Sequence, residues 1–505
     1  MGSKMDSGWI GMGLALVVSA CAFAQQPNVM IIYADDLGYG EVKAFNPERC
    51  KLETPWIDSL ACDGMVFTDG HSSSAVCTPS RYSMLAGRYS WRSKLQKGVL
   101  NPWGEDLLKP ERITMPELVK TKGYLTAAIG KWHLGWDWQK RDGQWVFDEP
   151  VCGGPVEHGY DYYFGPDVPD YPPFAWIEND RLSAMPVENS KPDPRGGRGG
   201  SLVPGWEPEA MLSTMAGKVA EYLEERAADQ KPFFLYFGLT SPHTPIVPSK
   251  DWKGKSGMGA YCDFVLETDH TVGQVLQALE KSGLDKNTLV FFSSDNGCSS
   301  GPSKSTKLAK EYDHYTSANL RGYKGSNFEG GTRVPFIVRW PGVVPAGSTC
   351  DRMVCQVDYM ATVADVLGIE MPEEAGVDSV SFLPLLKDPK AVLPRESLIL
   401  HNYYGEFSFR QGAYKLILAP GNGHGFGGGP SDTEAIKRGD PMVQLYNLEN
   451  DLAESVNLAE KQPEHVQNMT ERMVKEIRQG RTTPGRPLKN DVEIDIYKKY
   501  LHKEK

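Results

Sequence analysis

Short apolar segments alternate along the chain with longer segments of helical periodicity, and this alternation constrains the fold more than any other feature. The clearest apolar runs are Asn28–Ala34, Pro232–Leu239 and Thr288–Phe292. Runs so short and so uniformly apolar are typical of buried strands in a parallel sheet. Helical spacing is present in Glu207–Ala228 and Ala260–Lys281. The pattern predicts an α/β fold, with a mostly parallel sheet flanked by helices.

Smaller elements fit the same pattern. Helices are predicted over Thr54–Gly64 and Ile113–Lys122, and strands over Met65–Thr68 and Tyr124–Ile129. Two glycine-rich stretches lack the strand-then-helix context of a phosphate-binding loop, so they are predicted to be linkers or rims: Arg195–Gly200 and Gly421–Pro430.

The pattern changes near residue 390. Ser397–Tyr403, Phe407–Gln411 and Tyr414–Leu418 are short runs with tight connections, which predicts an antiparallel sheet. We therefore predict a catalytic domain over 27–388 and a smaller α+β subdomain over 389–505. A terminal helix is predicted from one apolar stripe, formed by Val466, Met469, Met473 and Ile477.

Composition excludes some classes of protein. The 505 residues carry a formal net charge of −11, which argues against nucleic-acid binding because that function needs a basic surface. Apolar residues make up 40% of the chain, so it is not mainly disordered. The cysteine spacing shows no disulfide framework, although Cys350 and Cys355 are close enough in sequence to pair.

The first 24 residues predict export. Trp9–Ala24 is apolar, follows Lys4 and ends in a small-x-small sequence, as a secretory signal peptide does. A buried helix or a single anchor is the alternative. Val18–Cys21 resembles a bacterial lipobox, in which Cys21 would carry a lipid, and the two processing routes stay open. Either route places the protein in the periplasm or outside the cell. No later segment is long and apolar enough to span a bilayer.

Polar side chains follow several of the predicted strands. Open α/β sheets place their sites at the carboxyl edge of the strands, so these side chains are predicted to meet there. The oxygen donors suit a hard cation, Ca²⁺ or Mg²⁺, better than zinc, which prefers histidine and cysteine. Turns that follow strands are the alternative for any one pair. The residues are Asp35, Asp36, His71, Lys131, His133, His243, Asp295 and Asn296.

Cys77 opens the sequence Cys-Thr-Pro-Ser-Arg. Thr78 can cap a helix and Pro79 suits its first turn, so Cys77 is predicted to lie at a helix N-terminus, where backbone N–H groups favour an anion. A buried structural cysteine is the alternative.

This pentapeptide resembles the C-x-P-x-R maturation motif of type I sulfatases. The resemblance extends from residue 28 to about 340, and the C-terminal unit is also similar to the family's. It includes arylsulfatase A-like and N-acetylgalactosamine-6-sulfatase-like enzymes, and it implies an alkaline-phosphatase-like fold and a bacterial carbohydrate sulfatase. Five further blocks match in the family's order: Asp35–Gly40, Gly130–Gly135, Ser241–Pro245, Ser294–Gly297 and Arg321–Gly331.

The resemblance implies two changes that make the site active. A formylglycine-generating or anaerobic sulfatase-maturating enzyme would oxidise Cys77 to Cα-formylglycine. The hydrated aldehyde offers one hydroxyl to attack sulfur and a second that expels sulfate, an exit that serine lacks. One Ca²⁺ would lower the pKa of this nucleophile. Its ligands would be Asp35, Asp36, Asp295, Asn296 and the modified residue 77.

The resemblance also assigns roles to the remaining side chains. Arg81 would orient the diol, and Lys131 and Lys324 would hold sulfate oxygens. His133 shares an extended segment with Lys131 and would take the proton of the second hydroxyl. His243 would bind substrate and protonate the leaving alcohol. Taken singly, Lys324 could be a solvated lysine and His243 could stabilise a turn.

The sulfated sugar is not defined by these motifs. The rim is predicted from 152–205 and the C-terminal unit, with sugar stacking or loop packing open for Tyr171, Phe174, Trp176 and Trp206. Hydroxyl binding or sheet packing is open for His401, Asn402, Tyr403 and Arg410. Asp269 is predicted to be a surface charge. The alternative functions are a phosphodiesterase or phosphonate monoester hydrolase of the same superfamily, or a sugar-binding homologue with a dead site.

Overall fold

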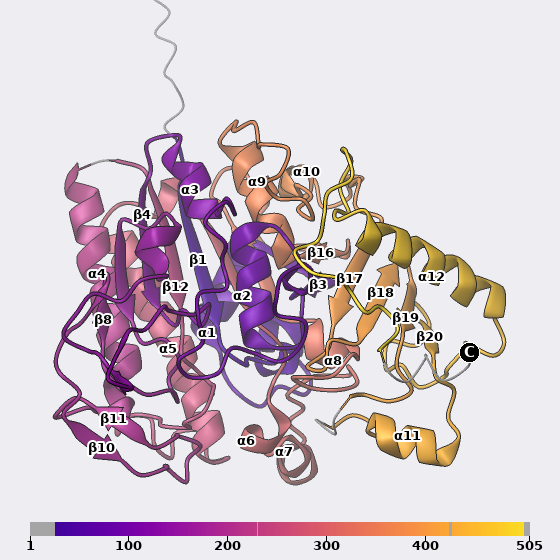
Figure 1. Cartoon of the computed structure of the whole chain (residues 1–505), viewed down its shortest axis with the longest axis horizontal. Helices are drawn as coiled ribbons and strands as arrows, with labels where there is room; N and C mark the ends of the chain where they lie inside the picture. The colour runs from indigo at the N-terminus through magenta and orange to yellow at the C-terminus, as the bar shows by residue number, and fades with distance from the viewer. Residues whose placement is uncertain (1–25, 230, 424–426, 499–505) are drawn as a thin grey trace, which may run out of the picture.

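A ten-stranded mixed sheet forms the centre of the larger part of the protein (Figure 1). The computed structural model describes residues 26–498 except 230 and 424–426. The strand order is β15-β2-β14-β13-β1-β12-β4-β7-β8-β9. The five central strands are mutually parallel: β13 (Thr288–Ser294), β1 (Asn28–Ala34), β12 (Phe233–Gly238), β4 (Leu125–Gly130) and β7 (Tyr162–Gly165).

The outer strands make the sheet mixed. Antiparallel pairs join β13 to β14, β14 to β2, β7 to β8 and β8 to β9, whereas β15 is parallel to β2. The outer strands are β14 (Phe336–Arg339), β2 (Met65–Phe67), β15 (Ser348–Cys350), β8 (Ile177–Glu178) and β9 (Arg181–Leu182). Three two-stranded ladders stand apart from it: β3 (Gly70–His71) with β16 (Val354–Cys355), β5 (Lys140–Arg141) with β6 (Gln144–Trp145), and β10 (Glu188–Ser190) with β11 (Gly200–Leu202).

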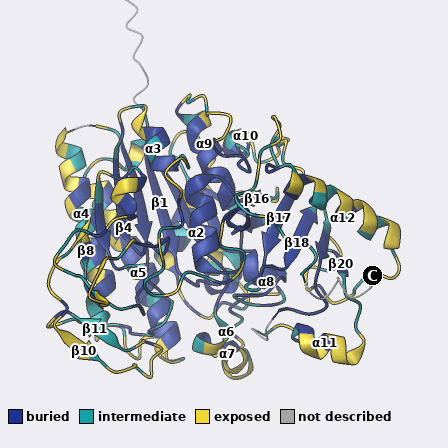
Figure 2. Cartoon of the chain, in the orientation of Figure 1, coloured by how far each residue is buried: buried dark blue, intermediate teal, exposed yellow. Residues whose placement is uncertain are grey.

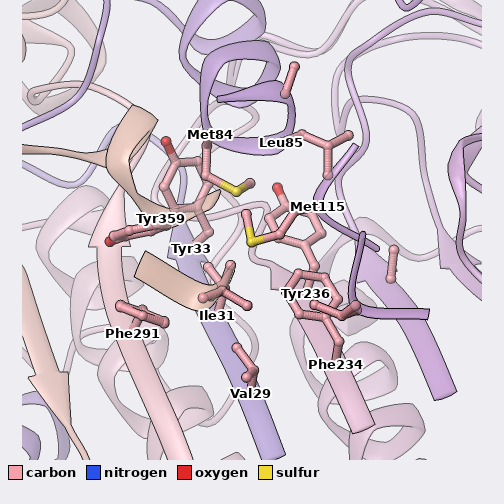
Figure 3. Close-up of a cluster of buried hydrophobic side chains, with 14 of the residues drawn as sticks. Val29, Ile31, Tyr33, Met84, Leu85, Met115, Phe234, Tyr236, Phe291 and Tyr359 are labelled. Atoms are coloured by element: carbon pink, nitrogen blue, oxygen red, sulfur yellow. The ribbon is translucent and has the colours of Figure 1, made fainter. Parts of the chain in front are cut away.

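Alternate residues of β1 point to opposite faces of the sheet, and both faces are buried. Val29, Ile31 and Tyr33 belong to one core cluster with Met84 of one helix and Tyr359 of another (Figure 3). The helices on this face are α2 (Cys77–Ala86), α3 (Met115–Lys120), α9 (Tyr359–Val366) and α10 (Leu383–Lys387).

The other face of the sheet is covered as well. Met30 and Ile32 of β1 belong to the second core cluster, mainly with side chains of three helices, together with Leu308 of α7 (Ser305–Tyr312). The three helices are α1 (Pro55–Asp63), α4 (Met211–Asp229) and α5 (Ala260–Lys281). The predicted α/β class, with helices on both faces of a largely parallel sheet, is confirmed.

Helix α2 is buried along its whole length (Figure 2). It ends at Gly87, whose φ of 58° is left-handed and whose N–H donates to the carbonyl oxygen of Ser83. The prediction that Thr78 caps this helix is wrong. Val76 is the N-cap, Cys77 is the first helical residue, and the Thr78 hydroxyl accepts from the Leu100 N–H at 3.2 Å. Thr78 therefore ties a neighbouring loop to the helix start.

The C-terminal part contains a separate antiparallel sheet, as predicted (Figure 1). Its order is β17 (Ser397–His401), β18 (Phe407–Gln411), β19 (Tyr414–Ile417) and β20 (Gln444–Asn447). The last strand was not predicted. Helix α12 (Pro463–Arg478) buries Met469, Met473 and Ile477 in the same core cluster as this sheet, which confirms its predicted stripe. The remaining helices are α6 (Ser300–Ser303), α7 (Ser305–Tyr312), α8 (Glu329–Thr332) and α11 (Asp432–Arg438).

A buried network of charges connects the two sheets. Arg410 on β18 donates to Asp69 at 3.0 Å and to Glu329 at 3.1 Å, and Lys415 on β19 donates to Glu329 at 3.0 Å. His71, at the end of β3, lies 2.8 Å from Asp69. Arg410 is thus committed to packing and is not available for substrate, and His71, whose role we expected to be structural, belongs to this network.

Two further sequence predictions, a disulfide and the absence of a membrane-spanning segment, can be compared with the structure. Cys350 and Cys355 are both free thiols, so the suggested pairing is wrong. No helix in the described part of the chain is long and apolar enough to cross a membrane. The predicted signal peptide, over 1–24, and the lipobox ending at Cys21 lie outside the described residues.

A buried histidine predicts how stability depends on pH. Burial lowers the pKa of His401 to about 3, against about 6.5 in an unfolded chain. Its contribution to stability is therefore complete above the unfolded pKa and is lost as the pH falls from about 6.5 towards 3. Between pH 7.5 and pH 5, His401→Gln should lose about 2 kcal/mol less unfolding free energy than the wild type. Urea titrations at both pH values test this, with His465→Gln on α12 as the control. Equal losses in wild type and His401→Gln would contradict it.

Candidate active site

The carboxyl ends of four parallel strands meet the first turn of α2. Asp35 and Asp36 directly follow β1, and Asp295 and Asn296 directly follow β13. Lys131 follows β4 directly, and His243 lies five residues beyond β12. This arrangement follows from parallel pairing, because strands that run the same way end at the same edge. The edge therefore gathers acids, an amide and two kinds of base around Cys77.

The oxygen donors of this edge form one connected group. The Asp36 N–H donates to Asp295 Oδ1 at 3.1 Å, and Asn296 Nδ2 donates to Asp36 Oδ1 at 2.7 Å. Asp36 has a left-handed φ of 67°, which turns the chain sharply after the strand. The remaining amide oxygen, Asn296 Oδ1, is buried without a hydrogen-bond partner among the described residues. A buried acceptor without a partner is uncommon and calls for an explanation.

Two lysines neutralise the two aspartates. Lys131 Nζ donates to both Asp35 oxygens at 2.8 and 2.7 Å, and Lys324 Nζ lies 2.8 and 2.6 Å from the two Asp36 oxygens. Burial opposes the charge of Lys324, but Asp36 outweighs it, so its pKa is raised well above the ordinary value. Burial would raise the pKa of Asp36, but Lys324 and His243 bring it below its ordinary value. Both lysines are therefore fixed positive charges.

Arg81 lies one turn beyond Cys77, as the helix spacing predicts. Its guanidinium donates twice to Asp295 Oδ2, at 3.0 and 2.7 Å, and once to the Tyr236 hydroxyl at 2.5 Å. It lies 3.6 Å from Asp35. Arg81 thus orients a predicted metal ligand, and its partner Tyr236 was missed because it lies inside an otherwise apolar strand, β12.

Cys77 lies between the two aspartates. Its sulfur is 3.7 Å from Asp35 Oδ1 and 4.0 Å from Asp36 Oδ1, and the residue is buried. Burial, followed by the charge of Asp295, raises the pKa of the Cys77 thiol. An unmodified cysteine here is accordingly a neutral thiol and a poor nucleophile at neutral pH.

His243 lies at the edge of the site. Its Nδ1–H donates to the Thr244 carbonyl oxygen at 2.6 Å, and its Nε2 is 3.9 Å from Asp36 Oδ2. Its side chain is 13% exposed, whereas Lys131, which follows β4, is fully buried. The ring therefore presents Nε2 to the site from the solvent side.

His133 follows Lys131 closely, but with a different backbone conformation from the one predicted. Its φ of 58° is left-handed, so the expectation of an extended segment from Lys131 to His133 is wrong. Its Nε2–H donates to the Leu100 carbonyl oxygen at 3.1 Å, which leaves Nδ1 as a buried acceptor with no partner among the described residues. Burial, then the charge of Lys131, lowers its pKa well below the ordinary value. The backbone N–H of His133 donates to Asp167, a strand-end acid after β7 that sequence reasoning missed.

The predicted rim aromatics fall into two groups. Tyr171 meets the His133 ring edge to face, with centroids 5.5 Å apart, and the Arg198 guanidinium lies over the Tyr171 ring at 4.7 Å. Trp176 stacks on Phe164 and packs against Trp206. Trp176 and Trp206 therefore pack a loop, as does buried Phe174.

The end of β17 also reaches the site. The His401 carbonyl oxygen accepts from Ala75, two residues before Cys77, at 3.1 Å. The Tyr403 N–H donates to Gly325, next to Lys324, at 3.1 Å. The C-terminal sheet thus holds both the loop before α2 and the loop of Lys324, and His401 and Asn402 are buried in this connection.

The donor set fits a hard divalent cation. The ligand atoms of four residues lie within 4.8 Å of one another: Asp35, Asp36, Cys77 and His243. Asn296 Oδ1 is the buried acceptor without a partner among the described residues, and a bound cation would satisfy it. Three carboxylates face three side-chain cations at this edge, so a bound divalent ion would leave a net positive site for an anion.

Comparison with known proteins agrees with this geometry. The family model described as Sulfatase matches residues 27–369, and one described as N-sulphoglucosamine sulphohydrolase, C-terminal, matches residues 324–417. N-acetylgalactosamine-6-O-sulfatase of Bacteroides thetaiotaomicron is 30% identical over 493 residues, covering 89% of this chain and 92% of that protein. Arylsulfatase A of Bos taurus is 31% identical over 487 residues, covering 90% and 87%.

Solved structures give the same result. A solved structure connected with the metabolism of multiple glycosaminoglycans by Bacteroides thetaiotaomicron has a TM-score of 0.78 and 29% sequence identity, covering 90% of this chain and 99% of that chain. A phosphonate monoester hydrolase of Agrobacterium radiobacter has a TM-score of 0.58 at 17% identity, covering 90% and 96%, and shares the fold alone. Because the family model spans well over half of the residues, this chain belongs to the sulfatase family and is a sulfuric ester hydrolase.

Proposed function

We propose that this enzyme removes sulfate from a sulfated carbohydrate, with residue 77 as formylglycine and one bound Ca²⁺. The observation that carries the proposal is the position of Cys77 between two acid–lysine pairs, at the start of a buried helix. A compact anion that reaches residue 77 would meet two fixed positive charges and the N–H groups of the first turn. The names of the relatives support a sugar sulfate as the substrate.

Five groups would hold the metal: Asp35, Asp36, Asp295, Asn296 and the modified residue 77. Ca²⁺ in that position neutralises charge on a sulfate oxygen and lowers the pKa of the nucleophile. Formylglycine hydrate supplies one hydroxyl for attack and another for release. Arg81 keeps Asp295 in place through its two hydrogen bonds and so acts as a positioning residue.

The lysines and histidines would divide the remaining work. Lys131 and Lys324 bind sulfate oxygens and keep their charge throughout, because their acidic partners raise the pKa of both. His243 protonates the leaving oxygen from Nε2, while the Thr244 carbonyl stabilises the charged ring through Nδ1–H. His133 holds the proton of the second hydroxyl at Nδ1, the nitrogen that has no partner among the described residues.

Release of inorganic sulfate tests the function. A panel of sulfated mono- and disaccharides from glycosaminoglycans, mucins and algal galactans should include substrates whose sulfate is released, as measured by ion chromatography. Phosphodiester and phosphonate monoester substrates should be turned over more slowly. Release of phosphate at a higher kcat/KM than sulfate would contradict the proposal, and no release from any member would overturn it.

Removal of the metal is a separate test. Exhaustive chelation should abolish activity and lower the thermal unfolding midpoint, because an ion that binds only the folded state stabilises that state. Ca²⁺ should restore both better than Zn²⁺, since the donors are mainly oxygens. Asn296→Ala should raise the Ca²⁺ concentration needed to recover the midpoint. A fully active protein shown to be metal-free would contradict the assignment.

The place of action follows from the N-terminal sequence. Residues 1–24 carry the features of a secretory signal, so we place the enzyme in the periplasm or outside the cell, where polysaccharide fragments are available. Before the protein can act, its partner is the maturation enzyme that converts Cys77 to formylglycine.

A further inference from the structure

A cavity of about 520 Å³ lies beside the segment that follows His243. Thr244, which accepts the His243 Nδ1–H, forms part of its wall. Lys304 and Lys307, at the start of α7, and Arg195 also line the cavity. A cavity this size has room for one sugar unit. Because His243 is proposed to protonate the leaving oxygen, the rest of the saccharide would continue into this space.

The lining of this cavity is cationic, in a protein whose net charge is −11. It contains Lys304, Lys307 and Arg195, and no aspartate or glutamate is among the described residues that line it. Such a concentration of one sign of charge in a hollow raises the local concentration of ligands of the opposite sign.

The three cations differ in how far they are already neutralised. Arg195 is saturated, since it pairs with both Asp193 and Glu209. Lys307 has one distant partner, Glu311 at 3.6 Å, and both side chains are about half exposed. Lys304 has no acidic partner among the described residues. It also adopts a left-handed φ of 56°, which non-glycine residues seldom do. Two ammonium groups therefore remain available for an anion.

The remaining lining suits a sugar ring. Glycines 259 and 301 leave open space, and Tyr261, although largely buried, forms part of the lining. The loop that carries Arg195 is held to the segment after β12, because the Ile246 N–H donates to the Arg195 carbonyl oxygen at 3.0 Å. The cavity is thus a formed part of the rim.

We infer that this cavity binds a second anionic group of the substrate, a uronate carboxylate or a second sulfate on the sugar next to the sulfated one, through Lys304 and Lys307. The inference rests on the proposed function and narrows its substrate class to acidic oligosaccharides. A monosulfated neutral sugar would leave both ammonium groups without a partner. Lys304 and Lys307 would then set specificity without touching the reacting atoms.

The experiment compares substrates that share one sulfated sugar. The best substrate of the sulfate-release panel is tested as three disaccharides, in which the neighbouring sugar carries a uronate carboxylate, the methyl ester of that carboxylate, or a second sulfate. The wild type should favour the carboxylate over the ester by about tenfold or more in kcat/KM, the scale of a hydrogen bond to a charged group. The ratio of kcat/KM for the disaccharide with a second sulfate to that for the methyl ester, set beside the carboxylate-to-ester ratio, shows which anion the cavity prefers.

The variants locate the effect in the cavity. In Lys304→Gln/Lys307→Gln the ratio of acid to ester should fall close to one, and in the wild type it should fall as salt is added. Lys310→Gln is the matched control, because Lys310 is an exposed lysine of the same helix that does not line the cavity. A ratio near one in active wild type, an unchanged ratio in the double variant, or the same drop in Lys310→Gln would each overturn the inference. If the wild type released sulfate from no panel member, the proposed function would fail and the inference with it.

Discussion

Replacing Cys77 with alanine is expected to abolish turnover, by about 10⁴-fold or more, the order seen when an enzymatic nucleophile is removed. The fold should persist, because residue 77 is the first residue of α2 and the hydrogen bonds of its sulfur to described residues are two long ones, with Asp35 and Asp36. Alanine is also the best helix former. Circular dichroism and the urea midpoint check the fold, and sulfate release from the best sugar substrate measures the activity.

Cys77→Ser separates attack from release. Serine can offer one hydroxyl to sulfur but has no second hydroxyl to expel sulfate, so the variant should release at most one equivalent of alcohol per site and then stop. Peptide mass must show that the serine is unmodified. Sustained turnover by this variant, or by Cys77→Ala, with no contaminating sulfatase, would eliminate the formylglycine mechanism.

His243→Ala should show the second largest effect, and the effect should depend on the leaving group. A sugar alkoxide needs a proton in order to leave, whereas 4-nitrophenolate hardly does. The loss in kcat/KM on a sulfated sugar should therefore be about 10²–10⁴-fold, the range of general acid catalysis, and much smaller on 4-nitrophenyl sulfate. The geometry agrees, since Nε2 is the ring nitrogen directed to the site.

Lys324→Ala is the control for this comparison. Lys324 contacts Asp36 and would bind the sulfate that both substrates share, so its loss should reduce kcat/KM similarly on both. Equal losses on both substrates for His243→Ala, with fold and sulfate affinity intact, would remove its role as general acid and make it a sulfate ligand.

The residues at the strand ends could be predicted because their pattern is local. A buried strand followed by Asp35 and Asp36 is visible in the sequence, and parallel pairing then brings it to the same edge as Asp295. The same rule accounts for Asp167 after β7, but the sequence of that short strand gave no comparable apolar run. Tyr236 was hidden for the opposite reason, since a hydroxyl inside an apolar strand looks like core.

Interactions between distant segments could not be predicted. Asp269 is not the expected surface charge: it is buried, and it accepts from the Trp56 and Ile57 N–H groups at the start of α1. Its position on α5 beside His270 contains no sign of that partner, because the contact spans more than two hundred residues. Strand β20 was missed because the segment before it is long and polar. The cationic cavity likewise brings together four separate segments of the chain.

The mass of the peptide that carries residue 77 tests the central claim most directly. Trypsin should release Leu52–Arg81, which contains Cys62 as well as residue 77 and so provides an internal reference. In active enzyme, fragmentation should place a loss of about 18 Da at residue 77, the change from thiol to aldehyde, while Cys62 still reacts with iodoacetamide. Sulfate release should scale with the converted fraction across preparations. Full activity in a preparation whose residue 77 is entirely unconverted cysteine would contradict the account.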